Sequence, residues 1–544
     1  MHKRLAGALV AAGLFAALSV AGATAGSSSH ASAKAGGSLT IDLQSDFDFV
    51  DPALDYFASG WEMTYATCLK LMNYPDKNGP AGSQLVPEAA AGFPKVSNNG
   101  KTYDFTVDAS FTKFSDGQRV TAANFKAAFD RDIDPKMQSP AAQFLTDVVG
   151  EQAANQGTAP SASGITTKGK HLIIQLTRPA PDFLSRLAMP FFCAIPTNMA
   201  RDPNGLNVYP SAGPYYIASR TPNREVILKP NPNYKGKRPH NVAQITYNIG
   251  NAIAATELRV QSAASDYAAS GVPPADYAAI AQKYGVNKSG GQFYAKPILR
   301  VNYLAMNTSR PLFKNNVALR KAVNYAIDRH ALLLQSGFLA GKRTDQILPP
   351  GLASFRDADL YPLKQPNLPL AKKLAQGHTG DGKAVLYTAN TGPYPLRAQV
   401  IQYNLKQIGI DVDIRQFARG VQITKTGNRD EAFDLSDTGW QADYADPFDF
   451  VNVLLDGSTI QSANNTDVSY FNDPSFIKQM HEAALLTGRG RDAAYGKLDI
   501  NIMKQAAPWA SFANSNLRMF VSHRWGCFTF SPVYQVDLAA ACVK

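Results

Sequence analysis

The sequence predicts an α/β protein of two or three domains, and three observations support this fold class. The chain has 544 residues, which is more than a single hydrophobic core usually serves. Its apolar fraction of 45% and charged fraction of 18% are those of an ordinary globular protein. Helical and strand patterns alternate through residues 316–414, as they do in α/β domains.

An export signal is expected at the start of the chain. Two basic residues at positions 3–4 precede an apolar run over residues 5–20, and A-T-A at 23–25 gives the small-x-small pattern of a cleavage site. We therefore expect residues 1–25 to be a signal peptide and residues 26–37, rich in Ser, Ala and Gly, to be a flexible leader. An uncleaved membrane anchor is the alternative, although the run is short for a span.

Four cysteines in an exported protein suggest two disulfides. Cys527 and Cys542 are close in sequence and could close a local loop, which would leave Cys68 with Cys193. Four cysteines nevertheless allow three connectivities. No Cys-x-x-Cys pair occurs, so no zinc site is expected. Because the first cysteine is Cys68, the signal also lacks the cysteine that lipoproteins modify.

The charge pattern gives little reason to expect a nucleic-acid partner. The net charge is +11 and is spread along the chain, with no basic run interleaved with aromatic residues. A mildly cationic surface could equally well keep the protein soluble or bind the anionic face of a membrane.

The N-terminal half predicts mostly strands. Residues 47–56 and 151–164 are expected to be loops, the first carrying aromatic and acidic residues. Thr121 is a predicted helix N-cap, with Phe125 and Phe129 following at helical spacing. Further segments show a helical spacing (61–72) or strand alternation (39–43, 103–107, 171–176 and 245–249).

The C-terminal half predicts helices between strands. Residues 316–334 have the apolar stripe of one amphipathic helix. Asp473 and Pro474 are a predicted N-cap and first helical residue. The remaining expected elements are helices at 370–375 and 397–408, strands at 385–387, 410–414 and 433–435, and a strand-rich, disulfide-pinned segment at 509–544.

Motifs of catalysis and metal binding are missing from the sequence. Residues 377–384 resemble a P-loop, but Ala384 stands where Ser or Thr would hold magnesium. The pair at 481–482 lacks the second histidine of a zinc protease, because position 485 is leucine. The aspartates within residues 443–449 lie three apart, which is not the spacing of a calcium loop. We expect no cofactor, no metal and no enzymatic activity.

Residues 433–455 carry the most informative chemistry. Trp440 lies three residues before Asp443, and an aromatic face beside a carboxylate is what a cationic or amine-bearing ligand requires. The alternative is a strand, a loop and a short capped helix whose polar residues are simply solvated.

Several segments together resemble the substrate-binding proteins of peptide-type ABC importers, solute-binding family 5. The matches keep their order and spacing over nearly all of the mature chain. They are L-V-P-E-A-A-A-G-F-P-K-V-S-N-N-G-K-T-Y-D-F-T-V at 85–107, K-F-S-D-G-Q-R-V-T-A-A-N-F-K-A-A-F-D-R at 113–131, A-G-P-Y at 212–215 with L-K-P-N-P-N-Y-K-G-K-R-P at 228–239, the run M-N-T-S-R-P-L-F-K to A-I-D-R at 306–329, and G-W-Q-A-D-Y-A-D-P at 439–447.

The resemblance implies a two-lobed periplasmic-binding-protein clamp, type II and cluster C-like, with an extra subdomain on lobe one. Lobe one would comprise residues 38–71, 170–296 and 512–544, the extra subdomain 72–169, and lobe two 297–511 with hinge strands at each end. A ligand would be trapped on closure, and the closed form would dock on a membrane permease. The implied partners are a peptide or similar polar ligand and this permease, and the protein is expected to be a monomer.

The resemblance also implies the ligand-binding residues. In peptide binders of this kind the Asp of W-Q-A-D takes the α-ammonium group, which here is Asp443 beside Trp440. Main-chain groups of Gly439, Trp440 and Gln441, and of the loop at 48–51, could pair with the peptide backbone as an added strand. Tyr444 completes the candidate set.

Two departures from the family pattern leave alternatives open. Some oligopeptide binders carry an arginine where this chain has Asp437, so the partner of a ligand carboxylate is unidentified. The missing lipid-modified cysteine allows a periplasmic, secreted or otherwise tethered protein. The rival functions are a binder of nickel chelates, haem or sugars on the same fold, an exported hydrolase, and a sensor or chaperone without a permease.

Overall fold

The computed structural model describes residues 36–544, which belong to one compact unit, Ala33–Lys544. The predicted signal peptide and nearly all of the predicted leader lie outside the described residues. Across residues 36–544, no helix is both long and apolar enough to cross a bilayer.

The first sheet has five strands in the order β11-β1-β10-β9-β8. β1 is parallel to β10 and β11, and the other pairs are antiparallel. Leu39, Ile41 and Leu43 alternate along β1 and are all buried in one core, as the sequence pattern predicts. The strands are β1 Ser38–Leu43, β8 Tyr215–Thr221, β9 Glu225–Pro230, β10 Gln244–Ile249 and β11 Tyr267–Ala268.

A four-stranded antiparallel sheet lies in the N-terminal part of the chain, in the order β4-β5-β7-β6. Helix α2 (Ala122–Ile133) packs on it through Phe125 and Phe129, both fully buried. Its start is fixed as predicted, because the side chain of Asn124 accepts a hydrogen bond from the backbone of Thr121 at 2.8 Å. The strands are β4 Lys95–Ser97, β5 Thr102–Thr106, β6 Ile165–Lys168 and β7 His171–Gln175.

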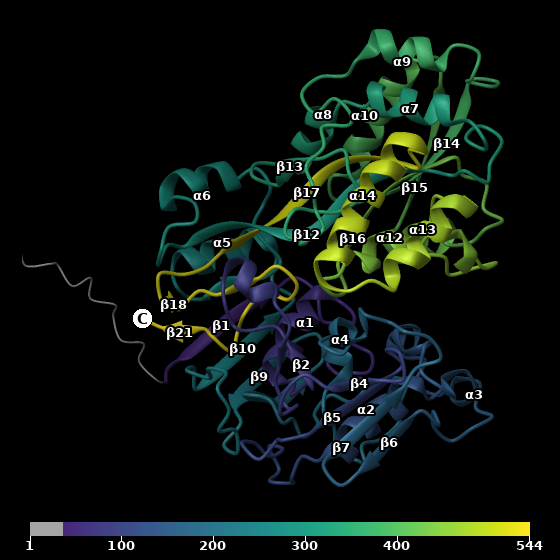
Figure 1. Ribbon diagram of the computed structural model, residues 1–544. Coiled ribbons are helices and arrows are strands. Elements are labelled where there is room, and N and C mark those ends of the chain that lie inside the picture. Colours follow the sequence, from purple (N-terminus) through teal and green to yellow (C-terminus); the bar gives the residue numbers. More distant parts are fainter. Residues whose placement is uncertain (1–35) are drawn as a thin grey trace, which may run out of the picture. The chain divides into compact units, whose positions relative to one another are not determined.

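The second large sheet has six strands in the order β13-β17-β12-β16-β14-β15. Its central strand β12 is buried on both faces. Leu304 packs in the core that includes α7 and α10, whereas Tyr303 packs in the core that includes α12 and α14. The strands are β12 Phe293–Met306, β13 Gly341–Arg343, β14 Lys383–Ala389, β15 Asp411–Phe417, β16 Leu435–Gln441 and β17 Trp509–Phe520. Figure 1 shows β17, in yellow, beside β12, in teal.

The helices and the smaller strands complete the described chain. The helices are α1 Ala58–Thr67, α3 Glu151–Asn155, α4 Phe183–Arg186, α5 Ile253–Gln261, α6 Tyr277–Tyr284, α7 Val317–Ala326, α8 Arg329–Leu334, α9 Leu368–Ala375, α10 Tyr394–Lys406, α11 Arg419–Thr426, α12 Phe448–Leu455, α13 Pro474–Ala484 and α14 Gly488–Gln505, with short 3-10 helices at Gly79–Ser83, Pro140–Leu145, Pro190–Phe192 and Gly457–Thr459. The paired short strands are β2 Met72–Asn73 with β3 Val86–Pro87, β18 Trp525–Gly526 with β21 Cys542–Val543, and β19 Phe530–Ser531 with β20 Gln535–Val536.

Three sequence predictions need correction. The single helix expected at 316–334 is broken into α7 and α8, because Asp328 leaves the helix and caps α8 by accepting from the backbone of Ala331. Residues 151–164, expected to be a loop, begin with α3. The strand expected at 433–435 is β16, which continues to Gln441 because it pairs with β12 along its whole length.

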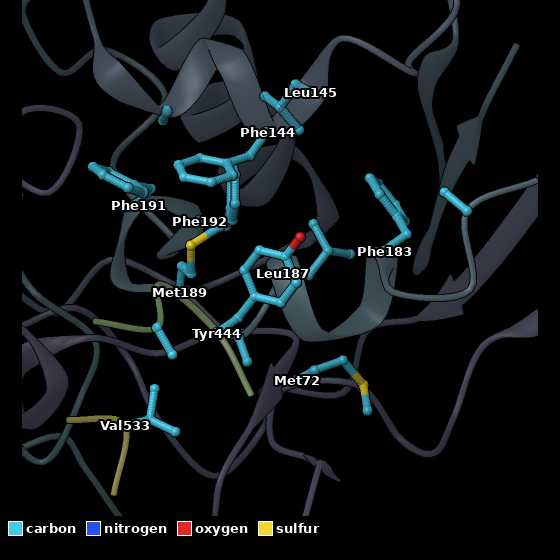
Figure 2. Close-up of a cluster of buried hydrophobic side chains, with 14 of the residues drawn as sticks. Met72, Phe144, Leu145, Phe183, Leu187, Met189, Phe191, Phe192, Tyr444 and Val533 are labelled. Carbon is cyan, nitrogen blue, oxygen red and sulfur yellow. The ribbon is translucent and has the colours of Figure 1, made fainter. Parts of the chain in front are cut away.

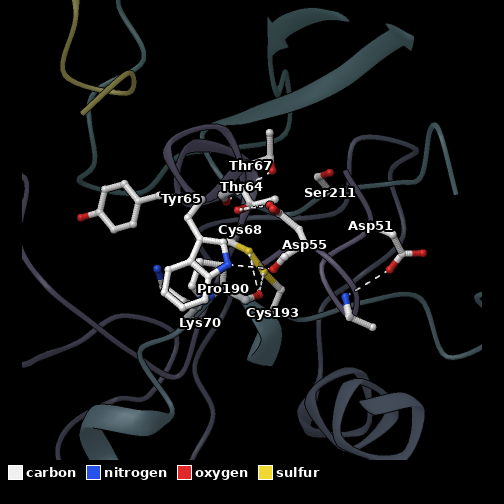
Figure 3. Close-up of a disulfide and its surroundings, with 12 residues drawn as sticks. Asp51, Asp55, Thr64, Tyr65, Thr67, Cys68, Lys70, Pro190, Cys193 and Ser211 are labelled. Carbon is white, nitrogen blue, oxygen red and sulfur yellow. Dashed lines mark hydrogen bonds between the residues drawn. A yellow bond between two sulfur atoms is a disulfide. The ribbon is translucent and has the colours of Figure 1, made fainter. Parts of the chain in front are cut away.

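The four cysteines form two disulfides. Cys68 is joined to Cys193 with a Cα–Cα distance of 5.3 Å, and Cys527 is joined to Cys542 with a Cα–Cα distance of 5.4 Å. Of the three connectivities that the sequence allows, this is the one in which Cys527 and Cys542 close a local loop. Figure 3 shows the first disulfide close to Pro190 and to the end of α1.

Candidate functional site

Strand β16 positions the W-Q-A-D segment against β12. Trp440 lies opposite Val301, and Gln441 lies opposite Arg300. The pairing continues past the strand, since the backbone N–H of Ala442 donates to the carbonyl of Leu299 at 2.8 Å. Asp443 therefore follows directly from a rigid strand and not from a mobile loop.

Gly439 is required by the close approach of its neighbours on β12. A Cβ at this position would lie 2.8 Å from the carbonyl oxygen of Val301 and from the Oδ1 atom of Asn302. It would also lie 3.1 Å from an Nη atom of Arg300. Glycine in mid-strand commonly marks such a close approach, and here it brings a guanidinium group next to the W-Q-A-D segment.

Asp443 is a buried carboxyl group without a cation. Its exposed fraction is 8%, and within residues 36–544 no Lys, Arg or His nitrogen lies within ion-pair distance of it. The hydroxyl of Tyr56 donates a hydrogen bond to Oδ2 at 3.0 Å. Burial raises the pKa of Asp443 to about 7, against a partly opposing effect of the Tyr56 hydrogen bond.

A second buried carboxyl group, Asp449, lies beside the first. Its Oδ2 accepts from the indole N–H of Trp440 at 3.1 Å and from the backbone N–H of Asp443 at 3.0 Å. Burial and the charge of Asp443 raise the pKa of Asp449 well above its usual range. The two carboxyl groups thus lie close together, and burial raises the pKa of both.

Asp446, the third aspartate of this segment, has a structural role. It forms an ion pair with Arg491 at 2.7 Å and accepts from the backbone N–H of Phe448 at the start of α12. Tyr444 is also enclosed: it is 1% exposed, and its hydroxyl donates to Asp182 at 3.0 Å. Figure 2 shows Tyr444 among the buried side chains of Phe144, Leu187 and Met189. The structure therefore does not bring Tyr444 to an accessible place beside Asp443.

The loop at 48–51 reaches the site through Tyr56. Asp48 accepts hydrogen bonds from the backbone N–H groups of Tyr56 at 2.9 Å and Phe57 at 3.1 Å, and this fixes the loop before α1. Asp51 is buried in a two-pronged ion pair with Arg131. Both carboxylates are engaged by the protein itself, and it is the hydroxyl of Tyr56 that meets Asp443.

Sequence reasoning placed Trp440, Gly439, Gln441 and Asp443 on one continuous segment, and the structure keeps them together. It missed Tyr56, which is 387 positions from Asp443 in sequence. Arg300 was also missed, although an arginine inside the apolar run P-I-L-R-V-N-Y-L-A-M at 297–306 is a usable signal.

A pocket of about 840 Å³ lies away from the W-Q-A-D segment, at the edge of the second large sheet, and is lined by residues that include Arg310, His378 and Asp434. Across residues 36–544 no group of three or more His, Cys, Asp or Glu side chains is arranged to hold a metal ion.

Comparison with known protein families identifies the chain. Residues 84–462 match the model of bacterial extracellular solute-binding proteins, family 5. The protein belongs to this family. The family is one of solute-binding proteins, and its fold is the two-lobed clamp expected from the sequence.

Relatives and solved structures agree over most of the chain. The chain is 25% identical over 512 residues to the probable D,D-dipeptide-binding periplasmic protein DdpA of Escherichia coli (strain K12), covering 91% of this chain and 92% of that protein. It is 26% identical over 457 residues to the periplasmic murein peptide-binding protein MppA of the same organism, covering 80% and 81%. The solved structure of clavulanic acid biosynthesis oligopeptide binding protein 2 matches with a TM-score of 0.84 at 22% identity, covering 94% of this chain and 96% of that one.

Proposed function

We propose that this protein is the extracytoplasmic receptor of an ABC importer and binds peptides, or small peptide-like ligands, between its two lobes. It delivers the ligand to a membrane permease, acts as a monomer, and catalyses no reaction. Peptide binding is stated in the names of several relatives, among them a DppA from Helicobacter pylori described in complex with the peptide STSA.

The carboxyl group of Asp443 carries the proposal. A buried carboxylate without a cation is costly, and a ligand ammonium group would supply the missing charge. Trp440 lies on the same segment and offers an aromatic face beside that ammonium group. The Tyr56 hydroxyl reaches Asp443 from another part of the chain, so a ligand held at Asp443 contacts both sides of the clamp.

The open edge of β16 supports binding of an extended backbone. β14 pairs with β16 only at Leu435 and Ser436. Within the described residues, the edge from Asp437 to Gln441 that faces away from β12 therefore has no strand partner. Main-chain groups of Gly439 to Gln441 are thus free to bind a ligand backbone by strand addition.

We keep the lobe boundaries predicted from the sequence as part of the proposal. Lobe one comprises residues 38–71, 170–296 and 512–544, lobe two comprises 297–511, and the extra subdomain comprises 72–169. The five-stranded sheet lies within lobe one. Strand β7 (His171–Gln175) of the four-stranded sheet lies beyond the boundary at 169, and β12 and β17 of the six-stranded sheet cross the boundaries at 296 and 511. The relatives DdpA and MppA are named as periplasmic proteins, which supports a location outside the cytoplasm.

The test is native mass spectrometry of the mature protein with trialanine. The wild type should bind one trialanine, and Asp443→Asn should lower the affinity about 100-fold, since the isosteric amide cannot pair with an ammonium group. Asp413→Asn, which changes an exposed aspartate on β15, is the matched control and should bind normally. Retention of a metal chelate or haem with unchanged binding by Asp443→Asn would contradict the proposal, and cleavage of trialanine would favour the hydrolase.

A further inference from the structure

Three arginines and a single aspartate meet next to the W-Q-A-D segment. Arg300 comes from β12, Arg397 from α10 and Arg419 from the start of α11. The aspartate is Asp437 on β16, which is fully buried. If all four groups are charged, this cluster has an excess of two positive charges.

Arg397 uses the single carboxylate of the cluster. Its Nε lies 3.0 Å from Oδ2 of Asp437, and its guanidinium lies 4.3 Å from the ring centre of Tyr394. The guanidinium of Arg419 lies over the same ring at 5.0 Å. Asp437 thus forms its ion pair with Arg397, and its single charge cannot balance all three arginines.

Arg300 and Arg419 have only neutral partners. Arg300 donates to Oδ1 of Asn302 at 3.3 Å, and Arg419 donates to Gln422 at 2.8 Å and weakly to Thr438 at 3.4 Å. Within residues 36–544, no carboxylate lies within ion-pair distance of either guanidinium. Both side chains are half-buried, and burial together with the charges of Arg419 and Arg397 lowers the pKa of Arg300.

The position of Arg300 relates the cluster to the ligand site. One of its Nη atoms lies against Gly439, as the 3.1 Å approach to the missing Cβ shows. Asp443 follows Gly439 by four residues, a span of at most about 13 Å at about 3.3 Å per residue. The uncompensated positive charge therefore lies against β16 at Gly439, and the uncompensated carboxyl group lies just beyond the end of this strand.

We propose that Arg300 and Arg419 bind the carboxylate of the ligand whose ammonium group is held by Asp443, and that the ligand is a tripeptide or tetrapeptide with a free C-terminus. Arginine recognises carboxylates with paired N–H donors. An extended peptide of up to about four residues keeps its terminal charges within roughly 13 Å of each other, which is also the upper limit of the backbone span from Gly439 to Asp443. This assignment rests on the proposed function, and it supplies the basic group that is missing at position 437.

The first arm of the test compares peptides. Isothermal titration should show that trialanine binds the wild type at least tenfold more tightly than its C-terminal amide, and more tightly than dialanine or hexa-alanine. Arg300→Gln should weaken trialanine binding and remove the preference over the amide. Arg489→Gln, which changes an exposed arginine on α14, is the matched control. Equal binding of acid and amide by the wild type, or a preference that survives in Arg300→Gln, would overturn the assignment.

The second arm does not depend on peptide binding. In thermal unfolding at equal ionic strength, sodium acetate should raise the Tm of the wild type more than sodium chloride does, and this difference should be lost in Arg300→Gln. The variant itself should fold with an unchanged or higher Tm, because it removes an unpaired charge. If no peptide binds, the proposed function fails while this arm still decides the anion site. Equal effects of acetate and chloride on the wild type would then exclude that site.

Discussion

Two buried aspartates near the site, Asp51 and Asp443, show why burial alone does not identify a binding residue. Asp51 is fully buried and is matched by two donors from Arg131. Asp443 is almost as deeply buried, but the protein offers it one hydroxyl group and no cation. The first arrangement is complete without a ligand, whereas the second holds a carboxyl group whose charge, when ionised, is balanced by no cation of the described residues.

The largest expected effect comes from breaking the buried ion pair between Asp51 and Arg131. Arg131→Gln leaves the Asp51 carboxylate buried and uncompensated, so the free energy of unfolding should fall by about 3–5 kcal/mol. Urea denaturation measures this loss. The double variant Asp51→Asn with Arg131→Gln should recover part of it, and no recovery would mean that Arg131 stabilises the fold by other contacts, such as its bond to the carbonyl of Ala200.

Removing the charge of Asp443 should instead increase the stability of the ligand-free protein. The Asp443 pKa of about 7 in the folded protein lies above the usual 3.8, so the folded state binds more protons than the unfolded state between these values. The free energy of unfolding should therefore fall as pH rises from about 4 to 7. Asp443→Asn removes this contribution and should stabilise the ligand-free protein at pH 8 by about 1–4 kcal/mol. A variant that is less stable than the wild type at pH 8 would contradict the contrast with Asp51.

Ligand affinity should change with pH in the reverse direction. Only the ionised form of Asp443 attracts an ammonium group, so the affinity for trialanine should rise between pH 5 and 7, by at most about tenfold per pH unit. Titration calorimetry in buffers of different ionisation enthalpy should detect up to one proton released at pH 6. An affinity that is independent of pH would show that Asp443 is already ionised throughout this range.

The smallest effect is expected at Tyr56. Tyr56→Phe removes the single hydrogen bond to the Asp443 carboxyl group, worth about 1 kcal/mol, and this bond lowers the pKa of Asp443. The midpoint of the pH dependence should therefore move upward while the fold is retained. Tyr403→Phe, which changes an exposed tyrosine on α10, serves as the control, and an unchanged midpoint in Tyr56→Phe would mean that the hydroxyl is not a partner in solution.

Local patterns predicted much of the fold but stopped short of the site geometry. The alternation of Leu39 and Ile41 and the capping residues Thr121 and Asp473 are local signals, and the corresponding elements are present. The length of β16 was underestimated, because the polar run after Leu435 has no alternation and is a strand only through its pairing with β12.

The partners within the site depend on contacts between distant segments. Tyr56 meets Asp443 across 387 positions, and Arg300 lies beside Gly439 because of the register between β12 and β16. Neither arrangement can be read from the spacing of residues along one segment. Tyr444 was included in the candidate set because it follows Asp443 in the sequence. In the structure its hydroxyl instead donates to Asp182, away from Asp443.

The return of the chain end to the first sheet has a consequence for the order of folding. Arg524 donates to the carbonyl of Ser38 at 2.8 Å, and Tyr534 bonds to the carbonyl of Ala188. The six-stranded sheet is built from the continuous segment between Phe293 and Phe520. During synthesis this segment can assemble as soon as β17 has emerged. The region around β1, although made earlier, lacks these contacts until residues 524–534 have emerged, so it is completed after the six-stranded sheet.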